Sequence, residues 1–269
     1  MNKFLLKNNL NHRKKIRKRF NRKKIIQKRG KITLPNSSFT NKQKYNCIIP
    51  QNIFQTWHSK ILPPLMFKAV QKIKENNPRF QYKLYDDNDC REHIRKYFRP
   101  DVLDAYDRLI PGAYKADLWR YCVLFIYGGI YLDIKYAPYN GFKFINLCEK
   151  EHYVLDADNA GIYNALMVSL PRNQVLYKAI RQIVANVKNR YYGNCCLSPT
   201  GPKLLTNFIS TNNHLVDLNH SLINTNNKFI YYNNIPILKS YNGHEMEKSY
   251  ASIRKHYSQL WSERNIYNR

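Results

Sequence analysis

The feature that most constrains this chain is the segment 116–136, where the pattern of a helix gives way at once to that of a strand. Apolar and aromatic residues dominate positions 118–126, and Gly128-Gly129 then interrupts the helix. The run Ile130-Tyr131-Leu132 is β-branched and aromatic, which is typical of a buried strand. A helix joined directly to a buried strand is a building unit of α/β proteins, so the segment predicts an α/β fold.

The chain before this segment alternates between strand-like and helix-like stretches. Residues 48–57 and 80–85 have the pattern of strands, and apolar spacing predicts helices over 65–76, 90–97 and 102–109. This alternation predicts a mostly parallel sheet flanked by helices. Ligands bind such sheets beyond the carboxyl ends of the strands. The residues that follow the predicted strands are therefore expected at one edge: Trp57, Asp86, Asp87 and Asp133.

After residue 138 the pattern is weaker. Short strands are predicted near 153–155, 166–168 and 229–232, and helices over 174–188 and after 200–202. Residues 250–267 are expected to form a final helix or a capping segment.

Two charged residues interrupt the apolar helix of the opening segment. Asp117 and Arg120 are three positions apart and share a helix face. A surface ion pair would explain them, but the surrounding side chains predict a largely buried helix, which favours a functional role. An arginine fork suits a diphosphate and a carboxylate suits sugar hydroxyls. Asp133, directly after the strand, is either a ligand-binding or metal-bridging carboxylate or a turn-forming residue.

Positive charge is distributed unevenly along the 269 residues. The formal net charge is +27, and residues 1–46 hold sixteen Lys and Arg with no Asp or Glu. This segment is expected to be a basic, disordered extension and linker. With 43% hydrophobic residues overall, the chain can bury a sizeable core, and residues 47–269 are expected to form one domain.

Membrane-spanning and cysteine patterns bear on the location of the protein. No apolar run approaches the ~20 residues that span a bilayer, and no signal-peptide core is visible. The six cysteines lack Cys-x-x-Cys pairs and zinc-finger spacing, which argues against a zinc site or a disulfide framework. We therefore expect a cytoplasmic protein, which the basic extension could bring to an anionic membrane surface or another polyanion.

Four motifs occur together in the first half of the chain: Ile49-Pro50 through Trp57, Tyr85-Asp86-Asp87, the run 116–121 and Gly128-Gly129 through Asp133. Together they resemble glycosyltransferase family 32, the enzymes with an Asp-x-Asp sugar-binding region that are related to initiating α-mannosyltransferases and, distantly, to clostridial glucosylating toxins. The resemblance extends over roughly residues 47–210 and includes Thr200-Gly201-Pro202 and the stretch 161–165.

The resemblance implies a GT-A fold and transfer of a hexose, with retention, from a UDP- or GDP-linked donor to a glycan, lipid or protein acceptor. By position, Trp57 would stack on the nucleotide base, and Asp117 would hold donor hydroxyls with Asn164 also at the donor. Arg120 would contact the sugar and diphosphate. Asp133 would be the first Asp of the Asp-x-Asp motif.

The second Asp of that motif, normally a direct Mn²⁺ or Mg²⁺ ligand, is Lys135 here. A lysine ammonium repels a cation, but it can itself neutralise the charge that develops on a departing diphosphate. One hypothesis is metal-independent transfer with Asp133, Lys135 and Arg120 as catalytic residues. The other is a degenerate domain that binds a sugar nucleotide without turnover. Because position 135 is a lysine, Asp133 is the only carboxylate of the motif that could bind a metal.

Two further possibilities concern the ends of the chain. The basic extension raises the alternative of a nucleic-acid-binding protein, although no nucleic-acid-binding motif is found in the remainder and no specific nucleic acid is expected. Near the C-terminus, His256 and Trp261 resemble residues that close the site in relatives, but lone His and Trp residues also serve as packing elements.

Overall fold

The structure is a computed structural model that describes residues 46–157, 161–224, 227–251 and 255–268. The expected disorder of the basic extension concerns residues that lie outside these ranges, apart from Asn46. In the described ranges, no helix has both the length and the apolarity that crossing a membrane requires.

The described strands form a single sheet in the order β2-β1-β3-β6-β5-β7-β8-β9-β4. Their bounds are β1 Asn52–Thr56, β2 Gln81–Tyr85, β3 Gly129–Leu132, β4 Tyr136–Pro138, β5 His152–Leu155, β6 Ile162–Ser169, β7 Val216–Asn224, β8 Asn227–Tyr232 and β9 Ile235–Ser240. The helices are α2 Pro64–Asn76, α3 Asp87–Tyr97, α4 Pro100–Arg108, α5 Gly112–Tyr127, α6 Gln174–Lys188, α7 Pro202–Thr206, α8 His244–Ala251, α9 Tyr257–Ser262 and the 3₁₀ helix η1 Phe144–Leu147.

The predicted α/β class is confirmed, and its sheet is mixed. β1 pairs in parallel with both β2 and β3, as the alternating pattern of the first half of the chain predicts. β5 and β7 are also parallel, whereas β3–β6, β5–β6 and the β7-β8-β9-β4 ribbon are antiparallel. The parallel part is held by crossover helices, but short hairpin connections between β7, β8 and β9 permit only antiparallel pairing.

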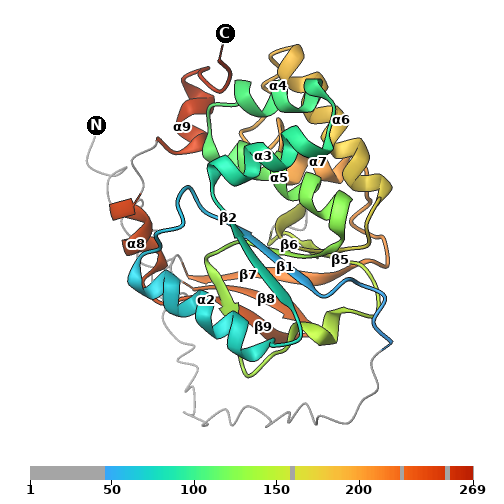
Figure 1. Cartoon of the computed structure of the whole chain (residues 1–269), viewed down its shortest axis with the longest axis vertical. Coiled ribbons are helices and arrows are strands. Elements are labelled where there is room, and N and C mark those ends of the chain that lie inside the picture. The colour runs from blue at the N-terminus through green and yellow to red at the C-terminus, as the bar shows by residue number, and fades with distance from the viewer. Residues whose placement is uncertain (1–45, 158–160, 225–226, 252–254, 269) are drawn as a thin grey trace, which may run out of the picture. The chain divides into compact units, whose positions relative to one another are not determined.

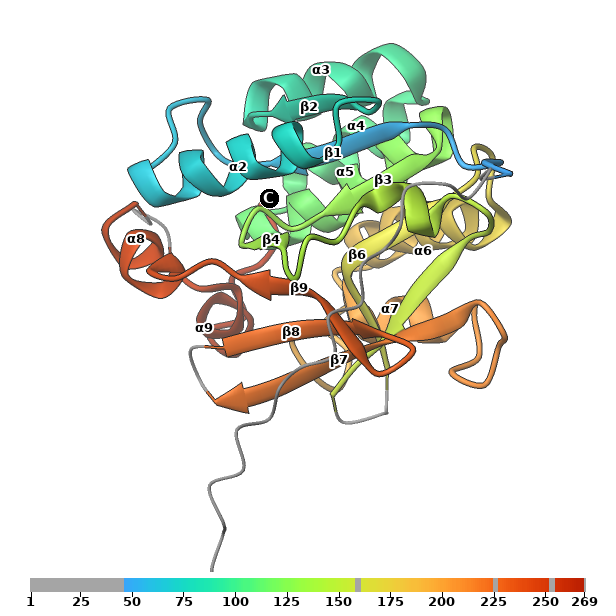
Figure 2. The ribbon, with the colours of Figure 1, turned by 90° about the horizontal axis from the view of Figure 1, so that it is seen from below.

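Side chains of β3 alternate between two cores, which shows how the layers are stacked. Tyr131 faces the core made with α3, α4, α5 and α6. Ile130 and Leu132 face the second core, which includes Ile230 of β8 and Leu238 of β9. Figure 1 shows α3 to α7 on one side of the sheet and α2 on the other, and Figure 2 shows β7-β8-β9 curling beneath β1 and β3. Because β3 is buried on both faces, it carries no charged side chain at any of its positions.

The junction between α5 and β3 depends on its two glycines. Gly128 and Gly129 adopt φ angles of 60° and 110°, which disfavour side chains. A Cβ at Gly128 would also lie 2.7 Å from Pro171, and one at Gly129 would lie 2.8 Å from the carbonyl oxygen of Asn52. The glycines therefore permit the sharp, crowded turn that brings Asp133 to the edge of the sheet near α5.

Other element boundaries differ from the sequence prediction. α3 begins at Asp87 because Asp86 and Asp89 form a capping box, in which the Asp86 carboxylate accepts from the backbone N–H of Asp89 at 2.9 Å. The predicted turn cluster is thus a helix start. Strands β7 and β9 and helix α8 were not predicted, and α9 is the helical part of the expected C-terminal segment.

Candidate functional site

A cleft of about 600 Å³ lies where β1 and β3 end, as expected for an α/β sheet. Its volume is within the ~300–1,000 Å³ typical of ligand pockets. One wall is the loop after β1 and another is the beginning of α5. The third wall comes from the C-terminal part of the chain, with His244, Glu245 and Lys248 of α8 followed by Lys255 and His256.

A cluster of partly buried charges centred on Asp133 lies at this cleft, where the side chains of Asp133 and Lys135 are 22% and 18% exposed. Lys135 Nζ is 2.8 Å from Asp133 Oδ2, and Arg120 Nη1 is 3.2 Å from Oδ1. The hydroxyl of Tyr131 also donates to Oδ1 at 2.8 Å. Burial alone would raise the pKa of Asp133, but Lys135 and Arg120 together lower it to about 2. Asp133 is therefore ionised at neutral pH, with both oxygens engaged.

Arg120 is held rigidly by its surroundings. Its Nη1 donates to the carbonyl oxygen of Asn164 at 2.7 Å, and its Nε donates to that of Ala116 at 3.2 Å. The guanidinium also lies 4.3 Å from the centre of the Tyr131 ring, in the geometry of a cation–π contact. Because Arg120 is only 5% exposed yet lines the cleft, it presents a fixed positive charge there.

Asp117 and Asn164 lie behind Arg120 and are not among the residues that line the cleft. Asp117 Oδ1 accepts from Asn164 Nδ2 at 2.9 Å, and its Oδ2 accepts from the Thr200 hydroxyl at 2.7 Å. Burial raises the pKa of Asp117 against the opposing effect of Arg120, which lies 3.3 Å away. In this structure Asp117 ties α5 to β6 and to the loop before α7, and thereby supports Arg120.

Trp57 is the first residue after β1 and lines the cleft. Its backbone N–H donates to the carbonyl oxygen of Tyr85 at 3.1 Å, which extends the β1–β2 pairing. Its indole ring packs against the ring of His58, with 4.6 Å between the centroids. The indole nitrogen is buried and has no hydrogen-bond partner among the described residues. The ring therefore forms part of the cleft lining and is supported by His58.

The two candidate closing residues of the C-terminus occupy different environments. His256 lines the cleft and caps α9, with its Nδ1 2.7 Å from the Ser258 hydroxyl. Trp261 lies away from the cleft wall, where its indole N–H donates to the carbonyl oxygen of Tyr192 at 2.7 Å. Its surroundings are those of a packing residue, which is one of the two interpretations that the sequence allows.

Sequence reasoning gave little weight to α8 as part of this site. His244 is buried beside the cleft, where burial and the nearby Lys135 lower its pKa to about 4, so the imidazole is neutral at pH 7. Lys248 adds a cation to the same wall. No local motif marks these residues, because they reach the cleft only through the fold. The cleft lining holds four cationic side chains against three carboxylates, and this small positive excess favours an anionic ligand. The cations are Arg120, Lys135, Lys248 and Lys255, and the carboxylates are Asp87, Asp133 and Glu245.

The donor set at Asp133 does not fit a divalent cation. The Lys135 ammonium lies against one oxygen of the single motif carboxylate, and Arg120 lies against the other oxygen. Across the described ranges, no group of three or more His, Cys, Asp and Glu side chains could hold a metal ion. A metal there would face two fixed positive charges.

An α/β sheet with fixed cations in a cleft at the ends of its parallel strands defines a class of proteins that can bind anionic ligands there. Comparison with known proteins narrows this class, because residues 63–166 match the family described as "Glycosyltransferase sugar-binding region containing DXD motif". The predicted resemblance to the mannosyltransferase-like glycosyltransferases is thereby confirmed. The middle of this chain is thus similar to the sugar-binding region of that family.

Individual relatives agree with this family. The chain is 35% identical over 91 residues to an initiation-specific alpha-1,6-mannosyltransferase of Candida albicans, which covers 32% of this chain and 24% of that protein. It is 29% identical over 157 residues to inositol phosphoceramide mannosyltransferase 2 of Schizosaccharomyces pombe, which covers 58% of this chain and 44% of that protein. The chain thus spans less than half the length of these relatives. Among solved structures it is similar to PaToxG glycosyltransferase, with a TM-score of 0.48 and 18% identity over 61% of this chain and 69% of that chain.

Proposed function

We propose that this protein transfers a hexose from a nucleotide-diphosphate sugar to an acceptor hydroxyl, with retention, and that Lys135 takes the charge-neutralising part that a metal plays in relatives. The observation that carries the proposal is the Lys135–Asp133–Arg120 cluster, in which two fixed cations face one cleft. Because the named relatives are mannosyltransferases, mannose is the sugar we favour, on a GDP or UDP carrier.

The chemistry asked of these residues is electrostatic. The bond between the anomeric carbon and the diphosphate oxygen breaks, and the acceptor oxygen forms the new bond to that carbon. The acceptor's hydroxyl proton passes to the departing diphosphate. Negative charge grows on the diphosphate during this step, and preorganised cations beside it lower the barrier. Lys135 and Arg120 are the groups we assign to that charge, while Asp133 orients both of them.

The remaining assignments follow from position in the cleft. We propose that Trp57 stacks on the nucleotide base and that Lys248 and His256 contact the donor from the opposite wall. We assign Asp117 and Asn164 an indirect part in donor binding, through Arg120. The Asn164 carbonyl oxygen accepts from the Arg120 guanidinium, and Asp117 in turn accepts from the Asn164 side chain, so both residues hold Arg120 in place. The acceptor is a hydroxyl of a glycan, a lipid or a protein.

Donor hydrolysis by the purified full chain tests the proposal, with GDP-mannose and UDP-glucose as donors and nucleotide release as the signal. We expect activity in EDTA, and a loss of about 10²–10³-fold in rate for Lys135→Ala, the range found when one transition-state donor is removed. Lys150→Ala is the matched control, because Lys150 also pairs with an aspartate, Asp217, at 2.7 Å but lies outside the cleft. Unchanged thermal midpoints would show that both variants fold.

Two results would contradict the proposal. Loss of hydrolysis in EDTA, with recovery in Mn²⁺, would mean that a metal and not Lys135 neutralises the diphosphate. Donor binding by calorimetry without any turnover would instead establish a sugar-nucleotide-binding protein. Lys135→Asp, which recreates the Asp-x-Asp motif, is expected to make any activity dependent on Mn²⁺.

A further inference from the structure

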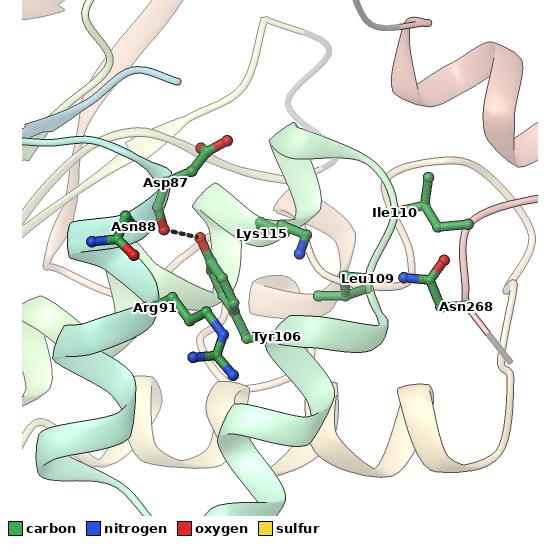
Figure 3. Close-up of a pocket in the computed structure, with 8 residues that line it drawn as sticks. All are labelled: Asp87, Asn88, Arg91, Tyr106, Leu109, Ile110, Lys115 and Asn268. Atoms are coloured by element: carbon green, nitrogen blue, oxygen red, sulfur yellow. Dashed lines mark hydrogen bonds between the residues drawn. The ribbon is translucent and has the colours of Figure 1, made fainter. Parts of the chain in front are cut away.

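A second pocket, of about 410 Å³, opens between α3, the end of α4 and the beginning of α5 (Figure 3). Asp87, the first residue of α3, lines both this pocket and the cleft. On α5, Ala116 lines the cleft and the preceding Lys115 lines the pocket. The two cavities are therefore neighbours across the beginning of α5, and one ligand could reach from one into the other.

Several polar groups around the pocket are held in place by their own contacts. Asp107 fixes the Arg91 guanidinium in a bidentate pair, with Nε–Oδ1 and Nη2–Oδ2 distances of 2.8 and 2.7 Å. Asn268 is attached to the end of α4, because its backbone N–H donates to the carbonyl oxygen of Arg108 at 2.8 Å. Such prior ordering reduces the entropy lost when a ligand binds.

The chemical character of the lining narrows the ligand class. Ile110 supplies an apolar surface, whereas Leu109, which also lines the pocket, is fully buried. The amides of Asn88 and Asn268 stand on either side of the pocket in Figure 3. Lys115 and the two amides supply several hydrogen-bond donors and acceptors beside the apolar surface. A ring with C–H faces and hydroxyl edges matches this combination.

Other ligand classes fit this lining less well. A nucleobase would need an open aromatic face, but Lys115 Nζ lies over the Tyr106 ring, 4.7 Å from its centre. An acyl chain would cover the exposed amide of Asn88 with hydrocarbon and displace the water that solvates it, which is costly. The pocket suits a polyhydroxylated ring best.

We propose that this pocket is an acceptor subsite that binds a polyhydroxylated six-membered ring, either a hexose or an inositol. The acceptor would reach past Asp87, so that its reacting hydroxyl meets the donor in the cleft. The assignment of the ring to the acceptor rests on the proposed transferase function, whereas binding of the ring itself does not.

Ring binding is measured directly by saturation-transfer NMR on the full chain, with methyl α-mannopyranoside and myo-inositol as separate probes. We expect at least one probe to bind, and the affinity to fall about tenfold or more in Asn88→Ala/Lys115→Ala. The preferred probe identifies the source of the ring. Lys96→Ala is the matched control, because Lys96 also lies over a tyrosine ring, that of Tyr97 at 5.1 Å, but away from the pocket. Asn88→Ala alone, at an exposed position, serves if the double variant does not fold.

Enzyme assays separate this proposal from the proposed function. Donor hydrolysis should stay within twofold of the wild type in Asn88→Ala/Lys115→Ala, while the KM for methyl α-mannopyranoside as acceptor rises about tenfold. No binding of either probe, or equal binding by the wild type and the double variant, would overturn the subsite. Equal losses of hydrolysis and transfer would overturn its assignment to the acceptor. If the protein does not hydrolyse the donor, but a probe binds the wild type and binds the double variant more weakly, the proposed transferase function is contradicted and the ring-binding pocket is not.

Discussion

At the scale of single residues, the site is a set of charges that balance one another. Asp117 and Asp133 face Arg120 and Lys135, so the four side chains have no net charge when all are ionised. Asp117 and Arg120 are buried, whereas the side chains of Asp133 and Lys135 are 22% and 18% exposed. Removing Asp117 or Arg120 therefore leaves an uncompensated buried charge, which is more costly than the intact pair is favourable.

The acid stability of the protein should report on Asp133. Its folded pKa of about 2 lies below the unfolded value, so its ionisation stabilises the fold above pH ~4 and this contribution is lost as the pH falls through 2. The free energy of unfolding of the wild type, relative to that of Asp133→Asn, should therefore fall by roughly 2 kcal/mol when the pH is lowered from 5 to 2. Urea unfolding followed by tryptophan fluorescence measures it. A difference that is independent of pH would show that Asp133 is not held ionised by its neighbours.

At the scale of elements, α8 and α2 are joined by one carboxylate. Pro63 at the start of α2 offers no side-chain cap, and Glu247 of α8 takes that role. Its oxygens accept from the backbone N–H groups of Leu65 and Met66 at 2.7 and 2.9 Å. The negative charge also complements the helix dipole. Because α8 forms a wall of the cleft, this contact couples helix capping to the shape of the cleft.

Replacing Glu247 should weaken both the fold and donor binding. We expect Glu247→Ala to reduce the free energy of unfolding by about 1–2 kcal/mol, the value of a helix cap, and to raise the KM for the donor. Glu92→Ala is the control, because the Glu92 side chain is 42% exposed and its pair with Arg95 is a surface contact worth under ~1 kcal/mol. Denaturant titration and donor-hydrolysis kinetics provide the two measurements. An unchanged KM in a clearly destabilised variant would show that the wall does not depend on the cap.

At the scale of the whole molecule, most of the net positive charge of the chain lies in residues 1–46. Sixteen of the Lys and Arg residues lie in 1–46, where there is no acid to balance them. We propose that this segment brings the enzyme to an anionic surface, where each basic residue contributes about 1 kcal/mol to binding. Such attraction weakens with salt, because the Debye length is only ~8 Å at physiological ionic strength.

Deleting residues 1–46 should separate localisation from catalysis. We expect donor hydrolysis in solution to stay within about twofold of the full chain, because every cleft residue lies at or beyond Thr56. Binding to phosphatidylserine vesicles, measured by sedimentation at low and high salt, should be lost. Hydrolysis lost in solution would contradict an accessory role for the segment. Preferential binding of the full chain to duplex DNA over these vesicles would favour the nucleic-acid alternative.

Much of the fold around the cleft could be predicted because its signals are local. The helix, the two glycines and the apolar strand of 116–133 specify the α5–β3 unit, and alternating elements specify the parallel pairing around β1. The expectation that Trp57, Asp87 and Asp133 meet at one edge agrees with their shared place in the cleft lining. The family itself could be recognised from these motifs, since they are contiguous in the chain.

The sequence by itself determined the α/β class, the cleft edge of the parallel strands and the substitution of a lysine for an aspartate at position 135. Only the tertiary structure decided that Lys135 pairs with Asp133, that Thr200 holds Asp117 behind the cleft, and that α8 forms its third wall. The reason is physical. Helix and strand patterns repeat over a few residues, whereas these contacts join residues far apart in the chain and exist only once the sheet has curled and buried them.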